Sequence, residues 1–235
     1  MRVSRKLHSF YWRSGFTLVE LLVVISIIGL LAGLAIPAIG SARNSGYKAK
    51  DISNVRQITG AILNYATELG GTLPGPANRG CKYPSKDPTN IKWISVLLIS
   101  NGFAPAGDAL WKAPAQTSTY QTETLGVAYI INNENFSDPP EFFGDPTKSV
   151  PTAPEKIIAL KANFVGGSNG LSKLWMVSVA DGENYGPASG AKNPLADNAR
   201  SPTGGRSYGY FDGHADFVKR VAPSKYPSSP KGTWK

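Results

Sequence analysis

Three ionisable residues near the C-terminal end of the chain stand at alternate positions, namely Asp212, His214 and Asp216. Alternate residues of a β-strand point to the same side, so such side chains could bind a metal ion or supply a general base. However, Asp212 is followed by Gly213, and Asp-Gly is a favoured turn of a β-hairpin. The pattern therefore favours a turn that carries an exposed histidine, and we expect no metal site here.

Common nucleotide-binding and zinc-binding motifs are missing from the sequence. It contains no P-loop, no Gly-x-Gly-x-x-Gly and no paired zinc-binding cysteines. A histidine-based triad would depend on His214, because the other histidine, His8, lies in a basic N-terminal stretch. We expect no enzyme and no catalytic residues, and keep an exported hydrolase that uses His214 as the alternative.

Oxygen-bearing side chains also gather in a polar stretch over residues 181–206, which is expected to be a surface loop. Asp181, Glu183, Asn184 and Asp197 could contact calcium, but their spacing is not that of an EF-hand. We expect no cofactor, with calcium as the alternative. The one cysteine, Cys81, permits no intrachain disulfide and is expected to be a loop residue.

Glu20 is the most unusual ionisable residue, because it interrupts an otherwise apolar stretch over residues 16–36. A helix of that length spans about 30 Å, the thickness of a bilayer core. A carboxylate inside such a helix costs roughly 2.5–3.5 kcal/mol or more and is usually there for a partner. A plain membrane anchor, or a signal peptide cut after the small residues 40–42, would explain the apolar stretch but not Glu20.

The stretch SGFTLVELLVVI, residues 14–25, resembles the type IV prepilin signal shared by pilins and type II secretion pseudopilins. The resemblance implies that a prepilin peptidase cuts between Gly15 and Phe16 and that the new Phe16 amine is methylated. It also implies that Glu20 pairs with the N-terminal amine of a neighbouring subunit. The expected partners are this peptidase, copies of the chain or other pseudopilins, an inner-membrane assembly platform and the lipid bilayer.

Charge indicates how the chain lies in the membrane. Four basic residues precede the apolar stretch, which predicts a single-pass protein of the inner membrane with a cytoplasmic N-terminus and an extracytoplasmic, or periplasmic, head. Removing residues 1–15 would lower the formal net charge from +9 to +5. That excess is too diffuse to indicate nucleic acid as a partner.

Two features of the expected helix bear on assembly. Gly29 and Gly33 form a Gly-x-x-x-Gly pattern, which offers a shallow surface for close helix packing. Pro37 follows the apolar run and is expected to kink the helix rather than end it. An amphipathic stem helix is expected over residues 37–70, ending at Gly70-Gly71; its apolar stripe comprises Ile52, Val55, Ile58, Ile62, Tyr65 and Leu69.

A globular head is expected over residues 71–221 and a flexible tail over 222–235. Residues 75–90 are predicted to be a loop and 91–100 a short helix, with strands over 125–131, 156–160 and 174–180. A two-residue turn at Asp212-Gly213 would pair Tyr210 with Ala215 and Tyr208 with Phe217, placing all four on the face that meets the stem. The fold class is thus α+β, with a long helix on a small antiparallel sheet.

Residues 208–218, YGYFDGHADFV, resemble the C-terminal signature of a large bacterial group of prepilin-like proteins that share an Asp-Gly-His motif. Many members carry a histidine where this chain has Pro202. The two resemblances imply a pilin-like fold and a structural subunit of a type II secretion pseudopilus or a type IV pilus-like filament. The absent disulfide and the resemblance of residues 54–74 to pseudopilin-type proteins favour the pseudopilin side. The alternative is a minor pilin whose head binds DNA or polysaccharide.

Overall fold

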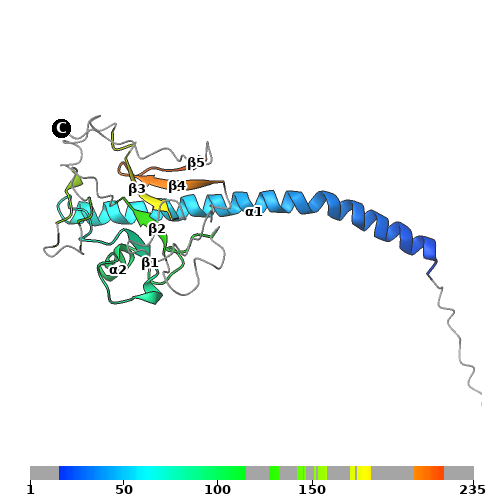
Figure 1. Ribbon diagram of the computed structural model, residues 1–235, viewed down its shortest axis with the longest axis horizontal. Coiled ribbons are helices and arrows are strands. Elements are labelled where there is room, and N and C mark those ends of the chain that lie inside the picture. The colour runs from blue at the N-terminus through cyan, green and yellow to red at the C-terminus, as the bar shows by residue number, and fades with distance from the viewer. Residues whose placement is uncertain are drawn as a thin grey trace, which may run out of the picture. The chain divides into compact units, whose positions relative to one another are not determined.

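The computed structural model describes residues 16–114, 127–132, 142–144, 146, 151, 153–157, 170–172, 174–180 and 204–219. The chain divides into two compact units, Met1–Arg43 and Asn44–Lys235. The described part confirms the α+β fold class: one long helix whose second half packs on a five-stranded antiparallel sheet (Figure 1). The leader expected over residues 1–15, the candidate calcium loop and the tail expected over 222–235 lie outside the described residues.

Helix α1 runs from Leu18 to Glu68 and includes Pro37. Proline removes one helical hydrogen bond and its ring crowds the carbonyl four residues earlier, which favours a bend. The helix nevertheless continues through Pro37 for a further 31 residues to Glu68. The kink at Pro37 stays a prediction. The helix ends where Gly70 and Gly71 take positive φ angles of 64° and 86°, which side chains with a Cβ rarely adopt.

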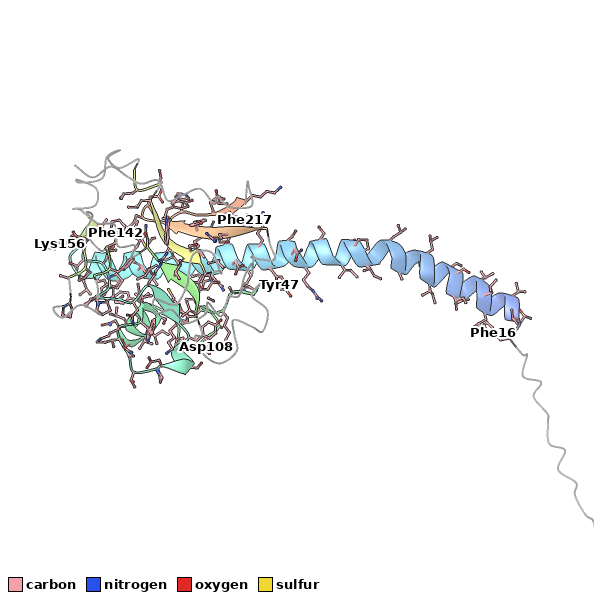
Figure 2. All side chains as sticks on the ribbon, viewed as in Figure 1. Phe16, Tyr47, Asp108, Phe142, Lys156 and Phe217 are labelled. Atoms are coloured by element: carbon pink, nitrogen blue, oxygen red, sulfur yellow. The ribbon has the colours of Figure 1, made fainter. Side chains whose placement is uncertain are left out.

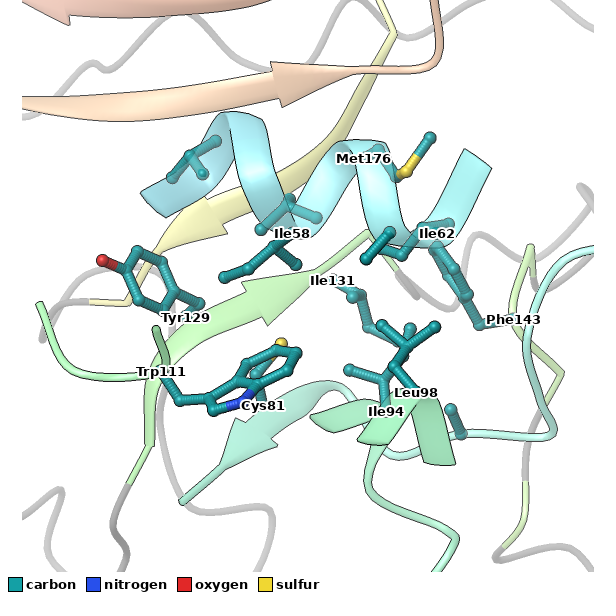
Figure 3. Packing of buried hydrophobic residues seen from close by; sticks show 14 of the residues in the cluster. Ile58, Ile62, Cys81, Ile94, Leu98, Trp111, Tyr129, Ile131, Phe143 and Met176 are labelled. Atoms are coloured by element: carbon teal, nitrogen blue, oxygen red, sulfur yellow. The ribbon is translucent and has the colours of Figure 1, made fainter. Parts of the chain in front are cut away.

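The stem half of α1 buries one face, as its apolar stripe predicted. Val55, Ile58 and Ile62 are fully buried and form one cluster with residues of the sheet and of α2 (Figure 3). The predicted stripe extends too far at its C-terminal end, because Leu69 lies beyond the helix and is 49% exposed. The buried face is also less apolar than predicted, since Asp51, Asn54 and Thr59 lie on it.

The sheet has the order β1-β2-β3-β4-β5, and all neighbours are antiparallel. Its strands are β1 Gly80–Lys82, β2 Val127–Ile131, β3 Trp175–Val179, β4 Gly205–Tyr210 and β5 Ala215–Lys219. The predictions for β2 and β3 are confirmed. Strand β1 falls in the stretch predicted to be a loop, and Cys81 within it is fully buried, which corrects its expected loop position.

Two short helices complete the described elements. The 3-10 helix η1 covers Pro84–Lys86, and α2 covers Ile94–Ser100, three residues shorter than predicted. The strand expected over residues 156–160 is represented only by an isolated bridge between Lys156 and Thr72, and residues 158–160 lie outside the described part.

The β4–β5 hairpin has a register one residue away from the prediction. Tyr208 pairs with Asp216, and Ser207 pairs with Phe217. The reason is a three-residue connection: the Tyr210 carbonyl accepts from the Gly213 N–H at 2.9 Å, and Gly213 has a φ of 95°. The extra residue moves Tyr208 and Tyr210 to the face away from α1, because a slip of one residue exchanges the two faces of a strand.

Candidate functional site

The start of α1 carries the residues that the sequence singled out. Phe16 is 77% exposed, and Gly15 lies just outside the described residues (Figure 2). Glu20 Oε2 accepts hydrogen bonds from the Thr17 N–H at 2.9 Å and the Thr17 hydroxyl at 2.8 Å, while Thr17 Oγ1 accepts from the Glu20 N–H at 3.2 Å. These reciprocal bonds form a capping box. The Thr-x-x-Glu spacing indicates this capping role of Glu20, which was not among the predictions made for the residue.

The first half of α1 exposes its apolar side chains on every side. Leu18, Leu30 and Leu34 are 79%, 68% and 71% exposed. Within the described part of the chain, α1 is the one helix long and apolar enough to cross a membrane, with a mean hydropathy of 2.7 over its best window. A helix that is hydrophobic all round requires lipid or neighbouring helices to cover it.

Gly29 and Gly33 lie on this exposed half. A Cβ added at either position would have no atom within 4 Å outside the local helix, so neither glycine is needed for packing within the described residues. Their role in packing between subunits stays a prediction.

The Asp-Gly-His hairpin docks on the stem half of α1. A Cβ on Gly209 of β4 would overlap the Thr59 hydroxyl and lie 3.0 Å from Val55 Cγ1. At the far end of the hairpin, Lys48 Nζ lies 3.8 Å from the centroid of the Phe217 ring. Glycine at position 209 therefore permits the close approach of strand and helix, and a cation–π contact supports it.

Asp212 and His214 organise the turn of the hairpin. Asp212 Oδ1 accepts from the His214 N–H at 3.2 Å and contacts the His214 ring nitrogen. The ring stacks on Tyr210 with centroids 4.2 Å apart. Asp216 Oδ1 accepts instead from the Phe217 N–H. Among the described residues there is no group of three His, Cys, Asp or Glu side chains placed to hold a metal ion.

A buried polar network joins α1 to the sheet. Asp51 is only 3% exposed, and its Oδ1 accepts from the Tyr129 hydroxyl at 3.3 Å. Asn54 Nδ2 donates to the same hydroxyl and to the Lys112 carbonyl, both at 3.1 Å. Burial raises the pKa of Asp51 from 3.8 to about 7, against the smaller opposing effect of the Tyr129 hydrogen bond.

Comparisons with known proteins agree with this arrangement. Residues 13–36 match the family model of the prokaryotic N-terminal methylation motif. The chain is 30% identical over 128 residues to the fimbrial protein EcpC of Eikenella corrodens, which covers 53% of this chain and 80% of that protein. No solved structure matches the chain.

The chain belongs to the type IV prepilin-like family. It is a pilin-like filament subunit, and the family is one of structural subunits rather than enzymes. The motif implies processing by a prepilin peptidase and assembly with other pilins. The apolar N-terminal half of α1 fits the single membrane anchor that such proteins carry.

Proposed function

We propose that this chain is a subunit of a type IV pilus-like filament, stored in the inner membrane through residues 16–36 before assembly. Its N-terminus would lie in the cytoplasm and its head outside. The observation that carries the proposal is the coincidence of the methylation motif with a helix that exposes apolar side chains all round. Such a helix is stable in lipid and, after assembly, among copies of itself.

Processing is the first step of this function. A prepilin peptidase would cut between Gly15 and Phe16, and the Phe16 amine would be methylated. Phe16 is exposed and precedes the first turn of α1, so a peptidase could reach the bond without unwinding the helix. Intact mass measurement of the protein from native membranes tests this: a chain beginning at Arg43 or retaining residues 1–15 would contradict it.

Glu20 would pair with the Phe16 amine of a neighbouring subunit during assembly. Because Glu20 also caps its own helix, Glu20→Ala removes two functions at once. Glu20→Gln is the matched variant, since glutamine retains an oxygen for the capping bonds and loses the charge. We expect both variants to be cleaved and both to enter filaments poorly. Wild-type incorporation of Glu20→Gln would rule out the charge pair.

The type of filament is decided by where the assembled subunit is found. The fimbrial relative favours a surface pilus over the type II secretion pseudopilus that the lack of a disulfide indicated. Filaments sheared from cells should therefore contain the mature chain. In the cell fraction, the subunit should contact the inner-membrane platform. A subunit that stays in the cell envelope, with loss of protein secretion on deletion of its gene, would instead identify a pseudopilus.

A further inference from the structure

The segment of α1 between its apolar half and its packed half has a marked charge bias. Residues 21–50 contain no aspartate or glutamate, and their basic residues, Arg43, Lys48 and Lys50, fall within eight positions of one another. Positive charge next to a membrane helix normally collects on the cytoplasmic side. Here it follows the apolar stretch, on the side expected to face away from the cytoplasm, so it requires an explanation other than orientation.

Two of these basic side chains share one face of the helix with an aromatic residue. Arg43, Tyr47 and Lys50 are related by steps of four and three residues, which places them one above another. Arg43 and Lys50 are exposed and Tyr47 is half-buried, and none of the three has an ion pair with a described residue. Figure 2 labels Tyr47 on α1. Lys48 points elsewhere, since its ammonium lies over the Phe217 ring.

The position of this face along the helix matches the headgroup layer of a bilayer. Ile39 is the last large apolar residue of the exposed stretch, and Arg43 follows it by about 6 Å of helix rise. Each headgroup layer is roughly 5–7 Å thick, so the Arg43 guanidinium can reach the phosphates. The Lys50 backbone lies about 10 Å further on, beyond a Debye length of about 8 Å. Because helical side chains lean toward the N-terminus, the long Lys50 side chain can bring its ammonium back within that length.

We propose that Arg43, Tyr47 and Lys50 form a lipid collar, a surface that binds the phosphate groups of anionic phospholipids at the extracytoplasmic face of the membrane. Guanidinium and ammonium groups supply the charge for phosphate, and the tyrosine ring suits the membrane–water interface. The collar fixes the depth of the stored subunit, and its lipid contacts break when the subunit enters the filament. This inference rests on the membrane-inserted state proposed above.

The test measures which lipids stay with the full-length mature chain. The protein is reconstituted in nanodiscs of phosphatidylglycerol and phosphatidylcholine, and the lipids retained after release are counted by native mass spectrometry. Each basic residue near a charged surface is worth about five-fold in lipid binding. We therefore expect Arg43→Gln with Lys50→Gln to lower the preference for phosphatidylglycerol about twenty-five-fold.

Two control variants test whether the lipid preference depends on the charge and on the position of the collar residues. Arg43→Lys with Lys50→Arg keeps both charges and should keep most of the preference. Arg56→Gln removes an exposed charge from the same helix, about 25 Å beyond Ile39, and should leave the preference unchanged. An unaltered preference in the double glutamine variant, or an equal loss from Arg56→Gln, would overturn the proposal.

Other occupants of this surface give different results. If inorganic phosphate abolishes the lipid preference and sodium chloride of the same ionic strength does not, the face is a site for free phosphate and the lipid collar is wrong. If the double glutamine variant weakens self-association in nanodiscs of phosphatidylcholine alone and leaves lipid retention unchanged, the face binds a neighbouring subunit instead. A mature chain that alkaline carbonate extracts from membranes would refute the proposed anchoring itself, whereas an inserted chain without lipid preference would refute only the collar.

Discussion

Replacement of Asp51 by asparagine should change how the stability of the head depends on pH. Asp51 is buried beside the neutral hydroxyl of Tyr129, and its pKa in the folded chain is raised from 3.8 to about 7. Between these values the unfolded chain loses a proton that the folded chain keeps, so the free energy of unfolding falls as pH rises. The full shift corresponds to an upper value of about 4 kcal/mol, at roughly 1.4 kcal/mol per pH unit.

The assay is urea unfolding of the mature chain in a non-ionic detergent, followed by near-ultraviolet circular dichroism of the buried aromatic residues. The wild type should lose stability between about pH 4 and about pH 7 and then level off, because Asp51 is ionised in both states above its folded pKa. Asp51→Asn should lack this part of the decline, since asparagine can still accept from Tyr129 but does not titrate. The difference in stability between variant and wild type should grow with pH.

Asp87 supplies a control, because its contribution to the free energy of unfolding changes with pH in the opposite direction to that of Asp51. The hydrogen bond from Trp93 Nε1 is the main influence that holds the pKa of this carboxyl below its ordinary value, so its contribution to stability is lost as pH falls. Asp87→Asn should therefore alter the acid limb of the curve and leave the decline toward pH 7 in place. Parallel curves for the wild type and Asp51→Asn would refute the assignment of that decline to Asp51.

Close packing of the stem and assembly of the anchor can be tested by other substitutions. Gly209→Ala should lower the free energy of unfolding by about 1–3 kcal/mol through overpacking, and Thr59→Ala in the same chain should restore part of it; additive losses would contradict the proposed contact. Ile58→Ala should cost about 2–5 kcal/mol in the same urea assay, because its side chain is fully buried. Gly29→Leu with Gly33→Leu should leave membrane insertion intact and lower the yield of crosslinked oligomers in membranes, and an unchanged yield would exclude this packing surface.

Local patterns in the sequence predicted the parts of the structure that depend on neighbouring residues. Val55, Ile58 and Ile62 are buried as their spacing indicated, since a helix of fixed pitch brings such residues to one face. Strand β2 was also found from its run of large apolar residues. The capping box of Thr17 and Glu20 was equally readable from its spacing, although the carboxylate was assigned only to a partner subunit.

The β4–β5 hairpin shows why local sequence patterns were insufficient to predict the register of the sheet. Asp-Gly favours a two-residue turn, but Gly213 serves here as the left-handed residue that closes a three-residue connection. The choice between these turns depends on which face of β4 can approach the helix. Gly209 fits against Thr59 without a side chain, whereas the prediction placed Tyr208 on the helix side. Packing against α1 therefore fixes the register.

The sequence by itself determined the apolar N-terminal helix, the prepilin-type methylation motif and the amphipathic stem, because each depends on one continuous stretch of chain. A peptidase recognises a linear segment, and a bilayer selects for length and apolar composition. Only the tertiary structure decided the burial of Cys81, the register of β4 and β5, and the environment of Asp51. That carboxyl meets a hydroxyl 78 positions away, and its pKa is set by the protein that surrounds it. Contacts between distant residues follow from how helix and sheet pack together, which no local spacing encodes.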